Sequence, residues 1–222
     1  MSQKLLIEGA VGQLELLIEE PDNPAPQAPV AVLCHPHPLH GGSLTNKVVH
    51  ILAATMNRLG ATAVRFNFRG VGRSEGEFDN MVGELEDLRA AVEWVRQHYP
   101  DAPLWLGGFS FGAQVALKMH ARVGAERLLV AAPPLSLYGS DDLPAIAIPW
   151  LVIQGSEDEV IDAHQVRDWV ARQTANPPQL IWLEGAGHFF HGRLNEVREA
   201  VIEAWPKLSP ALRAQGRVTR DE

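Results

Sequence analysis

Residues 104–117, LWLGGFSFGAQVAL, decide the fold, because a serine stands there between an apolar run and a helix-forming run. Leu104-Trp105-Leu106 has the character of a buried strand, and the residues after Gly112 favour a helix. A serine in a sharp strand-to-helix turn has a strained backbone, and small residues two positions to either side give that turn room. The stretch therefore predicts a strand, a tight turn that presents the Ser110 hydroxyl, and a helix.

Strands and helices alternate along the chain on both sides of this turn. Further strands are predicted at 30–34, 63–68, 127–131, 150–153 and 179–183, and helices at 46–59, 81–95, 111–123, 163–174 and 191–205. Asp79 or Asn80 is the expected N-cap of the second of these helices, and Asp162 that of the fourth. Such alternation favours an α/β fold with a mostly parallel sheet and helices on both faces. The first 20 residues hold two short strands without a helix between them, which predicts an antiparallel hairpin at the sheet edge.

The chain is predicted to form a single domain over residues 1–222. With 46% hydrophobic and 21% charged residues it has the composition of a globular protein and can bury one sizeable core. No long linker divides it, since the Pro-rich segment 21–29 only joins the edge hairpin to the core. The polar tail from Ser209 to Glu222 is expected to fray.

Charge and cysteine content exclude several classes of protein. Lys and Arg number 19 and Asp and Glu 27, which gives a net charge of −8, and no basic run offers the footprint of nucleic-acid binding. The single cysteine, Cys34, rules out an internal disulfide and fits a reducing compartment. The sequence shows no signal peptide and no apolar segment long enough to span a membrane. We therefore expect a cytoplasmic monomer or homodimer with no membrane partner.

Two serines stand in the pattern Gly-x-Ser-x-Gly, namely Ser110 and Ser74. Ser74 is flanked by the charged Arg73 and Glu75, and no helix follows it at once, so its segment is interpreted as a Gly-rich loop. The glycines of this loop also miss the Gly-x-Gly-x-x-Gly spacing of dinucleotide-binding loops. The context therefore selects Ser110 as the nucleophile.

A serine nucleophile needs a base, usually a histidine that a carboxylate orients. Asp158 and His188 each follow a predicted strand and stand after the serine in the order serine, acid, histidine. Asp162 and Glu157 are rival acids, but Asp162 has the position of a helix cap. His191 is the rival base, but it lies a step into the following predicted helix. Asp158 and His188 are therefore the predicted partners of the serine in a catalytic triad.

An acyl-transfer site also needs two backbone N–H donors for the developing oxyanion. The residue after the nucleophile, Phe111, supplies one of them. The second is expected from the loop after Cys34, where Pro36 and Pro38 have no N–H group. His37 is the best placed of the remaining residues.

The same loop contains three histidines, His35, His37 and His40, and raises the alternative of a metal site. Their spacing across prolines matches no standard zinc pattern, and no cluster of cysteines or carboxylates accompanies them. Cys34 lies within a strand and is a poor candidate for a nucleophile. The sequence therefore predicts no metal and no cofactor.

Three motifs together resemble one family: CHPHP at 34–38 with GGS at 41–43, RGVGRS at 69–74, and GFSFG at 108–112. Over nearly the full chain the sequence is similar to the serine α/β-hydrolase superfamily, in its branch of small bacterial hydrolases related to dienelactone hydrolases and lidless esterases. The resemblance implies an α/β-hydrolase fold in which loop 69–74 does not carry the nucleophile. Dienelactone hydrolases have cysteine where this chain has Ser110, so lactone specificity is not implied.

A lid is not expected in this chain. Only residues 132–148 separate the two strands between which hydrolases of this class often insert one, and so short a loop seldom forms its own domain. The site should therefore be open. Its expected pocket walls are Leu39, His40, Phe109, Phe189 and Phe190.

These observations predict a cofactor-free hydrolase of carboxylic esters whose substrate is a small-molecule ester with a short acyl chain. Ser110 would attack the carbonyl carbon, His188 would act as base and then as acid, and Asp158 would orient the histidine. A thioesterase or a small peptidase of the same fold is the alternative among enzymes. Among proteins that are not enzymes, the alternative is a non-catalytic binding module of the same fold.

Overall fold

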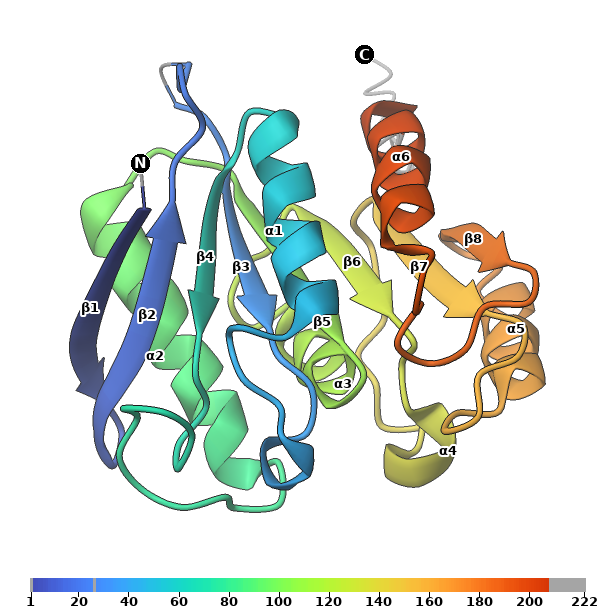
Figure 1. Ribbon diagram of the computed structural model, residues 1–222, viewed down its shortest axis with the longest axis horizontal. Helices are drawn as coiled ribbons and strands as arrows, with labels where there is room; N and C mark the ends of the chain where they lie inside the picture. The colour runs from blue at the N-terminus through green and yellow to red at the C-terminus, as the bar shows by residue number, and fades with distance from the viewer. Residues whose placement is uncertain (1, 26, 208–222) are drawn as a thin grey trace, which may run out of the picture.

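The computed structural model describes residues 2–25 and 27–207, and within them one eight-stranded sheet forms the centre of the molecule (Figure 1). The strands are β1 (Ser2–Gly9), β2 (Gly12–Glu19), β3 (Val30–Cys34), β4 (Thr62–Phe66), β5 (Leu104–Phe109), β6 (Arg127–Ala131), β7 (Trp150–Gly155) and β8 (Gln179–Leu183). They lie in the order β1-β2-β4-β3-β5-β6-β7-β8. The strands from β3 to β8 are parallel, whereas β2 is antiparallel to both β1 and β4. The predicted hairpin at the edge of a mostly parallel sheet is confirmed.

Helices cover both faces of this sheet. They are α1 (Lys47–Arg58), α2 (Val82–His98), α3 (Phe111–Met119), α4 (Leu135–Tyr138), α5 (Ala163–Ala171) and α6 (Leu194–Ala204), with the 3₁₀ helices η1 (Pro38–His40) and η2 (Trp205–Lys207). Apolar residues of α2, α3 and α5 belong to one core layer, and those of α1 and α6 belong to the other. The fold class that the sequence predicts is therefore correct.

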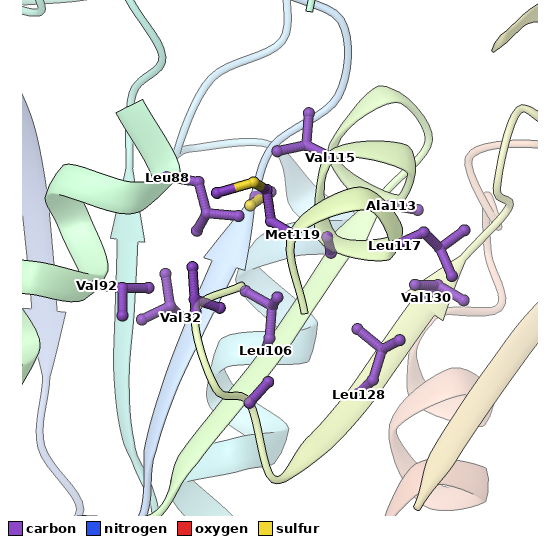
Figure 2. Packing of buried hydrophobic residues seen from close by; sticks show 14 of the residues in the cluster. Val32, Leu88, Val92, Leu106, Ala113, Val115, Leu117, Met119, Leu128 and Val130 are labelled. Carbon is purple, nitrogen blue, oxygen red and sulfur yellow. The ribbon is translucent and has the colours of Figure 1, made fainter. Parts of the chain in front are cut away.

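The two core layers follow from the alternation of side chains along each strand. In β3, Val32 belongs to one layer and Leu33 to the other. Figure 2 shows part of the first layer, in which Leu88 of α2 and Met119 of α3 lie among the same buried residues as Val32 and Leu106. This packing fixes α3, and with it the turn at the helix start, against the middle of the sheet.

The start of α2 differs from the prediction. The helix begins at Val82, and its N-cap is Met81, in a left-handed conformation with φ 76°. Neither Asp79 nor Asn80 caps it. The Glu84 carboxylate instead accepts the N–H groups of Asp79 and Met81, which folds the preceding chain over the helix start.

Other predicted helices are confirmed with shifted ends. Asp162 caps α5 as predicted. The helices predicted at 111–123 and 163–174 end earlier, and the helix predicted at 191–205 begins only at Leu194. His191 therefore lies in the turn before α6 and not within the helix.

The connection between β6 and β7 is short and carries no lid in the described part of the chain. Its one helix, α4, has four residues and lies at the carboxyl end of the strands (Figure 1). No helix within the described ranges is long and apolar enough to cross a membrane. The tail from Ser209 to Glu222, which is expected to fray, lies outside the described residues.

Candidate active site

Ser110 stands in the sharp turn between β5 and α3. Its backbone has φ 54° and ψ −121°, a conformation that L-residues rarely adopt. The turn is tight, because a Cβ on Gly108 would lie 2.2 Å from the Gly112 carbonyl oxygen. A Cβ on Gly112 would lie 2.3 Å from the Cys34 carbonyl oxygen. The two glycines of the motif therefore let the chain turn and let α3 approach β3.

The structure brings the three predicted triad residues together at the carboxyl ends of three strands. The Ser110 Oγ lies 3.0 Å from His188 Nε2, in the loop after β8. The other ring nitrogen, His188 Nδ1, lies 2.9 Å from Oδ2 and 3.1 Å from Oδ1 of Asp158, in the loop after β7. The side chains of His188 and Asp158 are 3% and 0% exposed, so this pair is shielded from water. Their arrangement is that of a nucleophile, a base and an orienting acid.

Asp158 is held in place by the backbone of its own loop. Its Oδ1 accepts hydrogen bonds from the N–H groups of Val160 and Ile161, at 2.9 and 2.7 Å. Burial raises the pKa of this carboxyl, but the hydrogen bonds from His188, Ile161 and Val160 outweigh burial and leave the pKa below its ordinary value. The carboxyl is therefore ionised and can stabilise an imidazolium.

The rival residues have other surroundings. Asp162 accepts the N–H groups of His164 and Gln165 as the cap of α5. Ser74 is buried, donates its hydroxyl to the Asn67 carbonyl and accepts the Glu15 N–H. Ser74 thus ties its Gly-rich loop to the edge of the sheet and has no histidine partner among the described residues.

The two predicted oxyanion donors lie beside Ser110. Phe111 is the first residue of α3, where the backbone N–H has no partner within the helix. His37 lies before η1, and its carbonyl accepts from His40 and Gly42. Within the described residues, no protein acceptor takes the N–H of His37 or of Phe111. Both residues line the same pocket as Ser110.

The neighbouring His35 fixes the loop that carries His37, a role that the sequence did not reveal. It is completely buried, its Nε2 accepts the Phe68 N–H at 3.0 Å, and its Nδ1 lies 2.6 Å from the Pro36 carbonyl oxygen. Burial lowers its pKa to about 4, so the ring is neutral at pH 7 and Nδ1–H donates to Pro36.

His37 and His40 are close neighbours, with ring centroids 4.5 Å apart. His37 Nδ1 accepts the Leu39 N–H, and burial together with the nearby His40 lowers the His37 pKa. The described residues contain no group of three or more His, Cys, Asp or Glu side chains placed to hold a metal ion.

A pocket of about 490 Å³ opens at Ser110, a volume suited to a small organic ligand. It is lined by Pro36, His37, His40, Gly41, Gly42, Asn46, Ser110, Phe111, Pro134, Leu137, Tyr138, Val160, Ile161, His188 and Phe189. The expected walls His40 and Phe189 are among these residues.

The residues that line the pocket do not include the other three expected walls, Leu39, Phe109 and Phe190, so this part of the prediction is wrong. Leu39 is 69% exposed and faces a separate hollow beside Phe78. Phe109 and Phe190 are buried in the core layer of α1 and α6, and the Phe109 ring lies 5.0 Å from that of His188. Phe109 therefore packs against the histidine ring within the core instead of facing the pocket.

Sequence reasoning missed five of the residues that line this pocket. Pro134, Leu137 and Tyr138 come from α4 and its start, and Val160 and Ile161 come from the loop of the acid. The Tyr138 ring packs edge-on against Phe111 at 5.7 Å. The pair of prolines at 133–134 is the only sequence signal for this turn.

Comparisons with known proteins agree with this fold. A family model described as an alpha/beta hydrolase domain matches residues 30–204. An uncharacterised protein of Rickettsia prowazekii is 38% identical over 187 residues, which make up 80% of this chain and 78% of that protein.

Two solved structures are similar over nearly their whole length. An α/β serine hydrolase homologue from Coxiella burnetii is 45% identical, with a TM-score of 0.86 over 91% of this chain and 96% of that one. A protein of Xanthomonas campestris, described as an α/β serine hydrolase without a lid, is 42% identical, with a TM-score of 0.89 over 95% of this chain and 96% of that one. The chain therefore belongs to the alpha/beta hydrolase family, among its serine hydrolases without a lid.

Proposed function

We propose that the protein is an esterase that hydrolyses small, uncharged carboxylic esters through an acyl-enzyme on Ser110. The observation that carries the proposal is the hydrogen-bonded chain from Ser110 Oγ through the His188 ring to the Asp158 carboxylate. A serine hydroxyl alone is a weak nucleophile, and a histidine within hydrogen-bond reach can remove its proton.

In the first half of the reaction, Ser110 Oγ attacks the ester carbonyl carbon while its proton passes to His188 Nε2. The Asp158 carboxylate accepts Nδ1–H and stabilises the imidazolium that forms. When the tetrahedral intermediate collapses, the bond to the alcohol oxygen breaks and His188 Nε2–H protonates that oxygen. The alcohol leaves, and an acyl ester on Ser110 remains.

In the second half, a water molecule gives a proton to His188 Nε2 and its oxygen attacks the acyl carbon. Collapse of this second intermediate breaks the bond to Ser110 Oγ, which regains its proton from His188. The carboxylic acid leaves and the starting state is restored. The backbone N–H groups of Phe111 and His37 are the proposed donors to the oxyanion in both halves.

The chemistry of the pocket supports an uncharged substrate. No Lys, Arg, Asp or Glu is among the described residues that line it. The lining includes the apolar side chains of Leu137, Val160 and Phe189, which suit an acyl group. It also includes the polar side chains of His37, His40 and Asn46, which suit the oxygen-bearing part of an ester.

The proposal is tested by giving the protein an ester, a thioester and an amide with the same acyl group. We expect the ester to have the highest kcat/KM, and Ser110→Ala to lower kcat by about 10⁴ or more, because the triad acts as a unit. The matched control is Ser74→Ala, which loses stability but keeps most of its turnover once folded. A higher kcat/KM for the thioester or the amide would replace the esterase by a thioesterase or a peptidase, and no turnover of any of them would favour a binding module.

A further inference from the structure

A wholly buried glutamine, Gln154, touches the carboxylate of the site. It is next to last in β7, and its side-chain Nε2 donates to Asp158 Oδ2 at 3.0 Å and to the Gly155 carbonyl oxygen at 3.1 Å. The residue has 0% exposure, so no bulk water reaches either hydrogen bond. This contact links the strand itself to the acid of the triad.

The orientation of the Gln154 amide follows from its neighbours. Both atoms near Nε2 are acceptors, and a flipped amide would place an oxygen against two oxygens. In the orientation found, the other amide atom, Oε1, is buried and has no partner among the described residues. An unpaired buried oxygen is unfavourable for folding. The glutamine therefore gives a donor to two buried acceptors, the Asp158 carboxylate and the Gly155 carbonyl, while its own oxygen stays unpaired.

The hydrogen bond matters to Asp158 because of how the two carboxylate oxygens are satisfied. Oδ1 has two backbone donors, the N–H groups of Val160 and Ile161. Oδ2 is the oxygen nearer to His188 Nδ1, and Gln154 is its one other donor within the described residues. Loss of the amide would leave Oδ2 free to rotate toward or away from the histidine.

The charged groups around this contact are few. The His188 ring faces the Asp158 carboxylate directly. The exposed Glu159 follows in the same loop, where its Oε2 accepts the His188 backbone N–H at 2.9 Å. Gln154 is neutral, so it donates to Oδ2 without the competing positive charge that lysine or arginine would place beside the imidazolium.

We propose that Gln154 is a positioning residue for the triad, which holds Asp158 Oδ2 toward His188 Nδ1 and draws part of the carboxylate's negative charge to itself. The inference rests on the proposed function, since it concerns the same three residues. Without the amide, the carboxylate turns more freely, and its full charge acts on the imidazolium.

The test compares Gln154→Met with Gln114→Met in ester hydrolysis as a function of pH. Gln114 is a matched control, because its side chain is also completely buried, donates Nε2 to one backbone oxygen, that of Gly139, and leaves Oε1 unpaired. Its backbone N–H donates to the Ser110 carbonyl oxygen, but its side chain has no hydrogen bond to a side chain of the triad. We expect Gln154→Met to lower kcat by about 10- to 100-fold, the range for one hydrogen bond to a charged group, with little change in KM. The acid limb of its kcat/KM profile should move up by about half a pH unit or more, because the carboxylate then favours the imidazolium more strongly.

The pH profile decides between positioning and mere packing. Gln114→Met should keep the wild-type midpoint even if it is less stable. A Gln154→Met profile with the wild-type midpoint overturns the proposal, whatever its kcat, because a packing defect can also slow an enzyme.

A measurement on the wild-type protein covers the case in which Gln154→Met does not fold. The side-chain amide protons of Gln154, followed by NMR, should shift with pH at the midpoint of the His188 ring, while those of Gln114 stay constant. A Gln154 signal that does not titrate overturns the proposal. If the wild-type protein neither hydrolyses esters nor reacts with a fluorophosphonate, the proposed function is wrong as well. If the wild-type protein reacts but the kcat/KM profile of Gln154→Met keeps the wild-type midpoint, this inference alone is wrong.

Discussion

At the scale of single residues, the site depends on buried polar side chains that hold loops in place. Asp158 is fixed by two backbone N–H groups and lies within hydrogen-bond distance of His188 Nδ1. His35 joins the loop of His37 to the segment that follows β4 through the Phe68 N–H. Since these groups are shielded from water, a change in their hydrogen bonding or charge has a larger effect than at the surface.

The assignment of the acid is tested with two asparagine variants. Asp158→Asn should fold but lower kcat by about 10⁴, because an amide no longer fixes the tautomer of His188 and cannot stabilise an imidazolium. Asp162→Asn should have little effect, since asparagine caps a helix as well as aspartate. Steady-state kinetics of both variants gives the answer. A normal rate in Asp158→Asn, with a large loss in Asp162→Asn, would move the acid to position 162.

His35 makes the stability of the fold sensitive to acid. Its pKa is about 4 in the folded protein and about 6.5 when unfolded, so the unfolded chain binds the proton first as the pH falls. Stability is fully present above pH 6.5 and is lost progressively between pH 6.5 and 4, by about 3 kcal/mol from this residue. Urea denaturation across this range measures the loss.

The variant His35→Gln isolates that contribution. Glutamine can accept the Phe68 N–H but does not titrate, so the variant should be less stable at pH 7 and yet lose about 3 kcal/mol less than the wild type on acidification. Equal losses in the two proteins would mean that His35 is not the group that takes up the proton.

At the scale of elements, the position of the nucleophile follows from the close approach of α3 to β3. Gly112, the second residue of α3, lies against the carbonyl oxygens of Cys34 and His35. The helix start can therefore approach the segment that leads to His37 only if no side chain intervenes. The same approach brings the Phe111 N–H to the pocket that His37 lines.

Gly112→Ala tests this packing. The new Cβ would stand 2.3 Å from a backbone oxygen, and we expect α3 to shift, with a loss of about 2 kcal/mol or more in unfolding free energy and of most activity. The control is Gly60→Ala. Gly60 also has a positive φ, 86°, but no heavy atom lies within 4 Å of where the new Cβ would stand. We expect this variant to lose about 1 kcal/mol of unfolding free energy and to keep its activity. Equal losses of stability and activity in the two variants would contradict the packing argument.

The elements and the triad positions could be predicted because their signals are local. Parallel strands are apolar runs, and the three residues each follow one of them. The pocket walls could not be predicted from the sequence, because their positions depend on how short connections fold. Phe109 and Phe190 are aromatic and near the site, yet both side chains turn into the core. Leu137 and Tyr138 lie on α4, which at four residues is too short to show helical periodicity.

At the scale of the whole molecule, the active end is open and apolar. The exposed large hydrophobic residues in the described ranges are Val11, Leu39, Val82, Leu137, Val160 and Phe189. Val11 lies in the turn between β1 and β2, and each of the others lies in the connection that follows one of the parallel strands. Three of them, Leu137, Val160 and Phe189, line the pocket, and the described residues form no lid between β6 and β7.

This openness predicts a preference for short acyl chains. Each methylene that becomes buried contributes about 0.8 kcal/mol, or roughly fourfold in kcat/KM, and the gain ends where the chain leaves the pocket. Measured from acetyl to palmitoyl esters, kcat/KM should rise over the first few carbons and then level off. Activity should also show no jump when the substrate passes its solubility limit. A steady rise to long chains, or a sharp gain on an emulsion, would contradict an uncovered site.

The central claim, that Ser110 is the nucleophile, is tested most directly by mapping a fluorophosphonate adduct. The reagent reacts with a serine only where a base activates it. After labelling and digestion, mass spectrometry should find one modified peptide, with the phosphonate on Ser110, and Ser110→Ala should abolish it while Ser74→Ala keeps it. An adduct on Ser74, or no adduct on the folded protein, would contradict the account.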